Sequence, residues 1–213
     1  MERGCFITLE GPEGAGKSTH AGRLAARLRT LGRDVVLTRE PGGTAGAEAV
    51  RELLVGGPVD RWSARSEALL LYAARSDHLE RVISPALAEG KTVVCDRFSD
   101  STLAYQGAAG GASGALLKAL EREIVGSFSP SLTLILDLPV AEGLARAAAR
   151  QRRRGGPEGR FEEKGLDFHE RLRAGFLALA AGEPERCVLI DAARGEAEVA
   201  AAIEAAVLFR VAA

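Results

Sequence analysis

The sequence predicts an α/β protein whose parallel sheet carries helices on both faces. Two observations predict this class. Apolar runs typical of buried strands recur between helical patterns, at residues 5–10, 34–39, 92–96, 132–138 and 187–191. The first run leads directly into the pattern G-x-x-x-x-G-K-[ST], and Leu24, Leu28 and Leu31 then continue at helical spacing. With 213 residues, the chain suits a single domain over 1–213.

Composition and charge give no reason to expect nucleic acid or a membrane as a partner. The formal net charge is −1, and the first residues lack the basic and apolar regions of a signal peptide. No apolar stretch reaches the roughly 18 residues that cross a membrane. Cys5, Cys95 and Cys187 are too few and too far apart for a disulfide framework or a zinc site, so we expect buried free thiols. We interpret the three histidines as incidental and expect a cytoplasmic protein.

The glycine-rich pattern predicts a phosphate-binding loop. Its strand–loop–helix context distinguishes it from an ordinary glycine turn. In such a loop, backbone N–H groups surround a phosphate chain at the positive end of the following helix. Lys17 is expected to reach the β- and γ-phosphates of a nucleoside triphosphate, and the Ser18 hydroxyl to ligate Mg²⁺. The residues of this predicted site are Gly11, Pro12, Glu13, Gly14, Ala15, Gly16, Lys17, Ser18 and Thr19.

Residues that follow the strands are the next candidates, because ligands bind beyond the carboxyl ends of parallel strands. Glu13 is an unexpected choice beside polyphosphate, since like charges repel. It either points away as a surface acid or accepts a hydrogen bond from a sugar hydroxyl of a second substrate. After the second strand, Pro41 indicates a turn, and Arg39 is either part of that turn or a phosphate clamp. Asp96 ends the third strand, where it could hold Mg²⁺ opposite Ser18. Arg97 beside it is either a bidentate phosphate ligand or half of a solvated ion pair.

A long helical pattern covers residues 63–89, and Pro85 is expected to break it. Its centre, 68–74, is apolar on all sides, which favours a subunit interface or burial in the core. Arg75 interrupts this stretch and is either a snorkelling surface residue or a ligand contact.

A basic segment follows the helical pattern at residues 140–151. It is a solvated face, a nucleic-acid patch or a mobile lid at about 150–162 that brings arginines to a transferring phosphoryl group. Its arginines are Arg150, Arg152, Arg153, Arg154 and Arg160.

From Phe6 to about Ala192, the chain resembles the bacterial thymidylate kinases. The resemblance is carried in order by the loop at 10–19, the REPGGT segment at 39–44, the YAAR segment at 72–75 and the DRF segment at 96–98 with the AYQG that follows. It implies the three-layer P-loop kinase fold with a five-stranded parallel sheet. It also implies transfer of the ATP γ-phosphate to dTMP, giving dTDP and ADP in dTTP synthesis, with Mg²⁺ as cofactor and a homodimer as the assembly.

The resemblance also implies roles for individual residues. Glu13 would contact the sugar 3′-hydroxyl, and Arg75 would read a thymine carbonyl. The loop residues 11–19 would bind ATP, and Ser18 and Asp96 would hold the metal. The implied dTMP site comprises Glu13, Arg39, Pro41, Leu71, Arg75, Arg97, Ser101, Thr102, Tyr105 and Gln106. The implied catalytic groups are Lys17, Arg97, Arg150 and Arg154.

Two departures from the family pattern affect these roles. Leu71 occupies the place of an aromatic residue that stacks on thymine, so the base would pack on an aliphatic surface. The lid carries extra residues, Arg152 to Gly159.

Position 14 is glycine, as in those family members that carry the catalytic arginine in the lid and not in the loop. The loop therefore has no cation beyond Lys17.

Other classes share the phosphate loop. A GTPase needs an Asn-Lys-x-Asp segment, and this chain contains no asparagine. A partitioning ATPase needs an amphipathic tail or a broad basic face, which the charge balance argues against. A kinase for a nucleoside or for another monophosphate is the main alternative.

Overall fold

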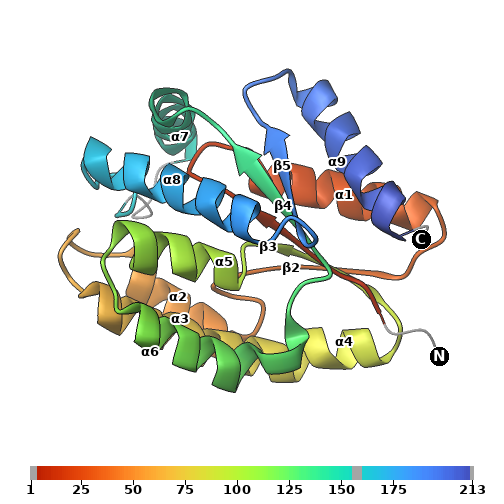
Figure 1. Cartoon of the computed structure of the whole chain (residues 1–213), viewed down its shortest axis with the longest axis horizontal. Helices are drawn as coiled ribbons and strands as arrows, with labels where there is room; N and C mark the ends of the chain where they lie inside the picture. Colours follow the sequence, from red (N-terminus) through yellow and green to blue (C-terminus); the bar gives the residue numbers. More distant parts are fainter. Residues whose placement is uncertain (1–3, 155–159, 212–213) are drawn as a thin grey trace.

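Five parallel strands form one sheet in the order β2-β3-β1-β4-β5 (Figure 1). The computed structural model describes residues 4–154 and 160–211, with the backbone alone at 154 and 211. The strands are β1 Phe6–Glu10, β2 Val35–Arg39, β3 Thr92–Asp96, β4 Leu132–Asp137 and β5 Cys187–Asp191. The predicted α/β class and all five predicted strands are therefore confirmed, with ends that differ by no more than one residue.

The burial of each strand follows from its place in the sheet. β1, β3 and β4 lie in the interior and are almost wholly buried, as expected for strands covered on both faces. β2 and β5 form the edges and have exposed positions. Because β1 lies between β3 and β4, the loop that follows it opens between the carboxyl ends of two neighbouring strands. This is the position at which doubly wound sheets bind ligands.

Helices cover both faces of this sheet (Figure 1). One face packs against α1 (Lys17–Thr30) and α9 (Glu196–Val211) in a core that includes Leu24, Leu134 and Ile203. The remaining helices are α2 Ala45–Val55, α3 Ala64–His78, α4 Ser84–Ala88, α5 Ser99–Thr102, α6 Gly114–Leu120, α7 Val140–Arg154 and α8 Leu166–Gly182. Two further apolar clusters include residues of α3, α4, α6 and α8. Thr44 and Ser63 cap α2 and α3, each accepting a hydrogen bond from the backbone N–H three residues later.

The prediction that Pro85 breaks the long helix is wrong. A π-helical stretch, η1 (Leu79–Ile83), joins α3 to α4, and Pro85 lies in the first turn of α4. The backbone N–H of Ser84 bonds to the carbonyl of Leu79, five residues earlier. The wider turn restarts the hydrogen-bond ladder just before the proline, whose missing N–H is then harmless. Two further π segments, η2 (Leu103–Ala109) and η3 (Glu121–Val125), continue α5 and α6, and the short 3₁₀ helix η4 (Gly126–Phe128) follows.

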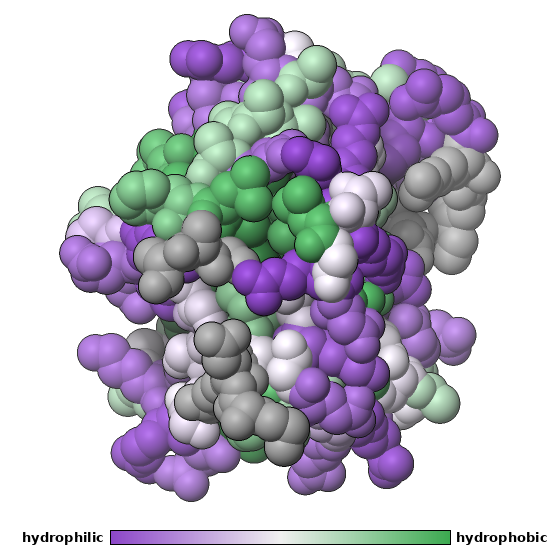
Figure 2. Space-filling view, turned by 90° about the vertical axis from the view of Figure 1, so that its right-hand side faces the viewer, coloured by the Kyte–Doolittle hydropathy of each residue, from purple (hydrophilic) through white to green (hydrophobic). Residues whose placement is uncertain are grey.

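Both ends of the described chain lie on the side of the sheet where the strands begin (Figure 1). Figure 2 shows this side, where apolar residues gather in one area that hydrophilic residues surround. The phosphate loop lies at the opposite, carboxyl end of the strands. Within residues 4–154 and 160–211, no helix is both long and apolar enough to cross a membrane.

Candidate active site

The loop at residues 11–16 is shaped by glycines that other residues could not replace. Gly11, Gly14 and Gly16 have φ angles of 131°, 74° and 87°, which only glycine adopts readily. A Cβ at Gly11 would lie 2.3 Å from the carbonyl oxygen of Leu136, and one at Gly14 would lie 2.2 Å from that of Gly143. The loop backbone thus packs directly on β4 and α7, which fixes its curvature.

Lys17, the first residue of α1, spans this loop. Its Nζ donates hydrogen bonds to the carbonyl oxygens of Gly11 at 2.9 Å and Pro12 at 2.6 Å. Burial, together with the charge of Arg97, lowers the pKa of the Lys17 ammonium to about 7. Phosphate oxygens would favour the charged form, so the position suits a polyanion.

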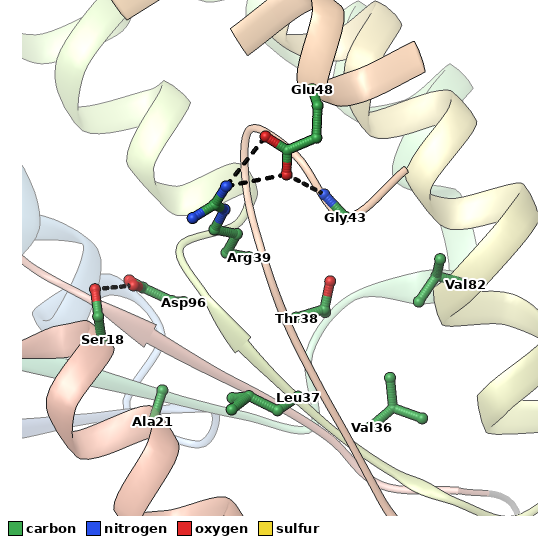
Figure 3. A pocket seen from close by; sticks show the side chains of 10 residues that line it. All are labelled: Ser18, Ala21, Val36, Leu37, Thr38, Arg39, Gly43, Glu48, Val82 and Asp96. Carbon is green, nitrogen blue, oxygen red and sulfur yellow. Dashed lines mark hydrogen bonds and ion pairs between the residues drawn. The ribbon is translucent and has the colours of Figure 1, made fainter. Parts of the chain in front are cut away.

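Ser18 and Asp96 meet at the end of β3, as the sequence predicted. The Ser18 hydroxyl donates a hydrogen bond to Asp96 Oδ2. Both residues line a cavity of about 410 Å³ that extends to Arg39 at the end of β2 (Figure 3). Arg39 Nη2 lies 3.1 Å from each carboxylate oxygen of Glu48, an acid on α2 that also accepts the N–H of Gly43. The predicted metal pair and the predicted phosphate clamp therefore share one cavity.

Glu13 points inward and not to the surface. Its side chain is 7% exposed. The Tyr105 hydroxyl donates to Glu13 Oε1 at 2.5 Å, and His169 Nδ1 lies 3.6 Å from Oε2. Burial alone would raise the pKa of this carboxyl, but His169 and the charge of Arg97 outweigh it and lower that pKa to about 2. Glu13 is thus an ionised acceptor at neutral pH.

Arg97 connects the phosphate loop to the segment after β3. Its Nη1 donates to the carbonyl of Gly11 at 3.2 Å and to Ser101 Oγ at 3.1 Å, and its Nη2 donates to the Tyr105 hydroxyl at 2.8 Å. Its backbone has a φ of 70°, which is unusual for a residue with a side chain. Strain of this kind is concentrated at functional sites. Glu10 supports the turn by accepting the Phe98 N–H at 2.7 Å.

Arg75 is buried on α3, which excludes the snorkelling interpretation. Only 1% of it is exposed. Its Nε donates to Glu40 Oε2 at 2.8 Å, and its Nη2 donates to Thr102 Oγ1 at 3.1 Å. Leu71, one turn earlier, is half-buried. The Gln106 amide, one turn beyond Thr102, donates to a carboxylate of α3. Arg75, Leu71, Thr102 and Gln106 therefore lie together at the junction of α3 with α5 and η2.

The predicted lid arginines differ in their surroundings. Arg150 is half-exposed on α7, with Nη2 3.1 Å from Glu162 Oε1. Arg160 points inward, with its guanidinium 2.7 Å from the carboxylate of Glu67. Arg154 ends α7, and its side chain, like residues 155–159, lies outside the described part of the chain. Arg160 is thus committed to a buried pair and not to a phosphoryl group.

Sequence reasoning missed several buried partners of the site. His78 bonds to Glu40 at 3.0 Å and to Thr38 at 2.7 Å, and His169 faces Glu13. Interpreting the histidines as incidental was therefore wrong for two of the three. The sequence did offer one signal, at Glu10. An ionisable residue at the end of a buried strand needs polar partners nearby, so Glu10 indicated that such partners exist.

The fold and this loop together define a P-loop kinase. A parallel sheet presents a glycine loop and its lysine at the carboxyl edge, and arginines and carboxylates converge around them.

Comparison with known proteins identifies the family. The family model for thymidylate kinase matches residues 9–203. The chain is 59% identical to the thymidylate kinase of Caulobacter vibrioides over 99% of both chains. It is 55% identical to that of Dinoroseobacter shibae over 93% of both. The crystal structure of thymidylate kinase from Ehrlichia chaffeensis superposes with a TM-score of 0.71 at 35% identity, covering 89% of this chain and 93% of that one. The chain belongs to the thymidylate kinase family.

Proposed function

We propose that this protein transfers the γ-phosphoryl group of ATP to dTMP, giving dTDP and ADP for dTTP synthesis. The observation that carries the proposal is the cluster of Glu13, Arg97 and Tyr105 against the phosphate loop. A buried acceptor, a cation and an aromatic ring thus lie together beside the loop, where a second nucleotide would meet the triphosphate.

A coupled ADP-release assay across dTMP, dUMP, CMP, UMP, AMP and thymidine tests this function. We expect dTMP to give the highest kcat/KM. A higher value for another monophosphate, or for the nucleoside, would redirect the assignment to a different small-molecule kinase.

Each group has a defined part in the transfer. An oxygen of the dTMP phosphate attacks the γ-phosphorus while its bond to the β–γ bridging oxygen breaks, and ADP leaves with that oxygen. Lys17 and Arg97 balance the negative charge that spreads over the transferring group. Arg39 would hold the dTMP phosphate, and Glu13 would accept the 3′-hydroxyl. Within the single domain 1–213, a lid at about 150–162 would add a further arginine.

The chain offers a fitting site for Mg²⁺. Asp96 Oδ1 is buried and has no hydrogen-bond partner among the described residues. Mg²⁺ prefers oxygen ligands and is commonly held by one or two protein groups together with substrate phosphates. Ser18 and Asp96 would hold the ion, which when bound neutralises charge on the β- and γ-phosphates.

We further infer a homodimer that acts in the cytoplasm. The outer side of α3 exposes Leu69, 45% accessible, and the adjoining α2 exposes Leu53, 41% accessible. Exposed apolar side chains on two helices that pack together suit contact with a second copy of the chain. The free thiols Cys95 and Cys187 suit a reducing compartment.

Tyr105 is expected to exclude ribonucleotides. Its ring is 7% exposed and lies edge-on to Phe161 and Phe176, so its position is fixed. Tyr105→Ala should raise the efficiency for ribothymidine monophosphate relative to dTMP by about ten-fold or more, because space opens at C2′. Steady-state kinetics with both substrates measure this ratio. Tyr105→Phe is the control, since it retains the ring, and an equal ratio in all three proteins would contradict the role.

Leu71 is the position at which an aromatic side chain could stack on the base of dTMP. Leu71→Phe is expected to tighten dTMP binding a few-fold, because aromatic packing adds about 0.5–1.5 kcal/mol beyond burial. Calorimetry gives the dissociation constant. Leu208→Phe is the matched control, since Leu208 is exposed on α9, away from α3 and the predicted dTMP site. No gain at position 71, or an equal gain at both positions, would place the base elsewhere.

A further inference from the structure

Two rows of side chains meet where α3 packs on α5 and η2. Glu67, Leu71 and Arg75 recur every four residues of α3 and so share one face. Thr102 and Gln106 form the opposing row. Arg75 Nη2 donates to Thr102 Oγ1 at 3.1 Å, and Gln106 Nε2 donates to Glu67 Oε2 at 2.8 Å. These two hydrogen bonds thus connect the rows at both ends, and Leu71 lies between Glu67 and Arg75 in the sequence.

At each of these two contacts, one buried polar atom has no hydrogen-bond partner among the described residues. Arg75 Nη1, a donor, and Gln106 Oε1, an acceptor, have no hydrogen-bond partner in the part of the chain that the structure describes. Their side chains are 1% and 2% exposed. A buried polar group of this kind destabilises the protein unless a ligand pairs with it.

The unpaired donor and acceptor match one kind of pyrimidine. A 4-keto pyrimidine presents a carbonyl acceptor beside an N3–H donor. A 4-amino pyrimidine presents an amino donor beside an N3 acceptor, which opposes both Arg75 Nη1 and Gln106 Oε1. The discrimination depends on the orientation of the Gln106 amide, because turning it by 180° would present its NH₂ group instead.

Glu67 prevents that turn. Its carboxylate is 1% exposed and pairs with Arg160 Nη2 at 2.7 Å, so it accepts hydrogen bonds and offers none. Only the NH₂ group of Gln106 can face it. Arg160 is fixed in turn, because its guanidinium also donates to the carbonyl oxygens of Leu54, Pro58 and Val59.

We propose that Glu67, held by Arg160, is a positioning residue that sets base specificity. It orients the Gln106 amide so that the carbonyl meets the base, and the site therefore selects 4-keto over 4-amino pyrimidines. The inference rests on the proposed function and on the dTMP site that the family resemblance implies, which includes Arg75 and Gln106. Because Arg160 belongs to the predicted lid segment, the same pair connects that segment to base recognition.

The substitution Glu67→Gln reverses the pattern in a defined way. Arg160 offers only donors, so the new side chain must turn its carbonyl toward Arg160 and its NH₂ toward Gln106. Gln106 must then turn its own carbonyl toward position 67 and its NH₂ toward the base. We expect the ratio of kcat/KM for dTMP to that for 5-methyl-dCMP to fall by at least about ten-fold.

A second substitution separates positioning from a general structural effect. In a Gln106→Met background, adding Glu67→Gln should leave the dTMP to 5-methyl-dCMP ratio unchanged, because no amide remains to be turned. The KM for ATP and the unfolding temperature monitor the rest of the fold. If Glu67→Gln does not fold, Arg160→Gln tests the proposal in its place. It should lower the same ratio a few-fold, because it releases the Glu67 carboxylate from its ion pair.

A failure of the proposed function can be distinguished from a failure of the role proposed for Glu67. A wild-type enzyme that does not phosphorylate dTMP would overturn the proposed function. A wild-type enzyme that prefers dTMP, with folded variants that keep the same ratio or lose both activities in equal proportion, would overturn the role of Glu67 alone.

Discussion

Lys17→Ala is expected to abolish phosphoryl transfer while the protein stays folded. Lys17 Nζ lies within hydrogen-bond distance of two loop carbonyls and is the only cation supplied by the loop itself. Removing one preorganised group that stabilises transition-state charge lowers kcat by about 10²–10³-fold. Here the loss should be at least that large, measured as dTMP-dependent ADP formation.

Lys118→Ala is the matched control for this prediction. Lys118 is exposed on α6, so its removal should leave the rate unchanged. Thermal unfolding of both variants reports on the fold. A folded Lys17→Ala enzyme that retains substantial dTMP-dependent activity would contradict the assignment of the phosphate loop.

Arg150→Gln is expected to lower kcat by about 10³-fold or more and to leave the KM for dTMP nearly unchanged. Arginines that close on a transferring phosphoryl group contribute about 10³–10⁵ in rate. In the structure, Arg150 pairs with Glu162, with side chains that are 44% and 29% exposed. Exposed pairs are weak, so this one can be exchanged for a phosphoryl oxygen. Arg154, one turn later, is the other predicted source, and its neutralisation should act in the same way.

Arg152 provides the control on the same helix. Residues 150 and 154 share one face of α7, whereas residue 152 lies about 200° around the axis. Arg152→Gln should therefore change kcat little. The opposite kinetic pattern for Arg150→Gln, a raised KM for dTMP with normal kcat, would mean that Arg150 only binds substrate and that the catalytic cation lies elsewhere.

The sheet and the loop were predictable because their signals are local. Each strand is a contiguous apolar run, and the glycine pattern lies within a few residues of the strand that positions it. Ser18 and Asp96 were also predictable as neighbours, since the carboxyl ends of parallel strands meet at one edge. The structure places them in hydrogen-bond contact.

The buried partners were not predictable because they come from distant parts of the chain. Glu67 and Arg160 are 93 residues apart, and only the packing of the folded helices joins them. Glu13 of the phosphate loop and His169 of α8 meet in the same way. Over so few residues, the sequence of a π-helical segment does not differ in pattern from that of an α-helix. The sequence therefore did not indicate that the helix continues past Pro85.

The contact between Gly14 and Gly143 restricts how this enzyme could be altered by mutation. The backbones touch from both sides, because a Cβ at Gly143 would lie 2.6 Å from the carbonyl oxygen of Glu13. Any side chain at position 14 therefore requires α7 to move away. An arginine added at position 14 would thus displace the helix that carries Arg150. The two possible sources of a catalytic cation are linked through this backbone contact, so a cation cannot be added to the loop without moving the helix that leads into the predicted lid.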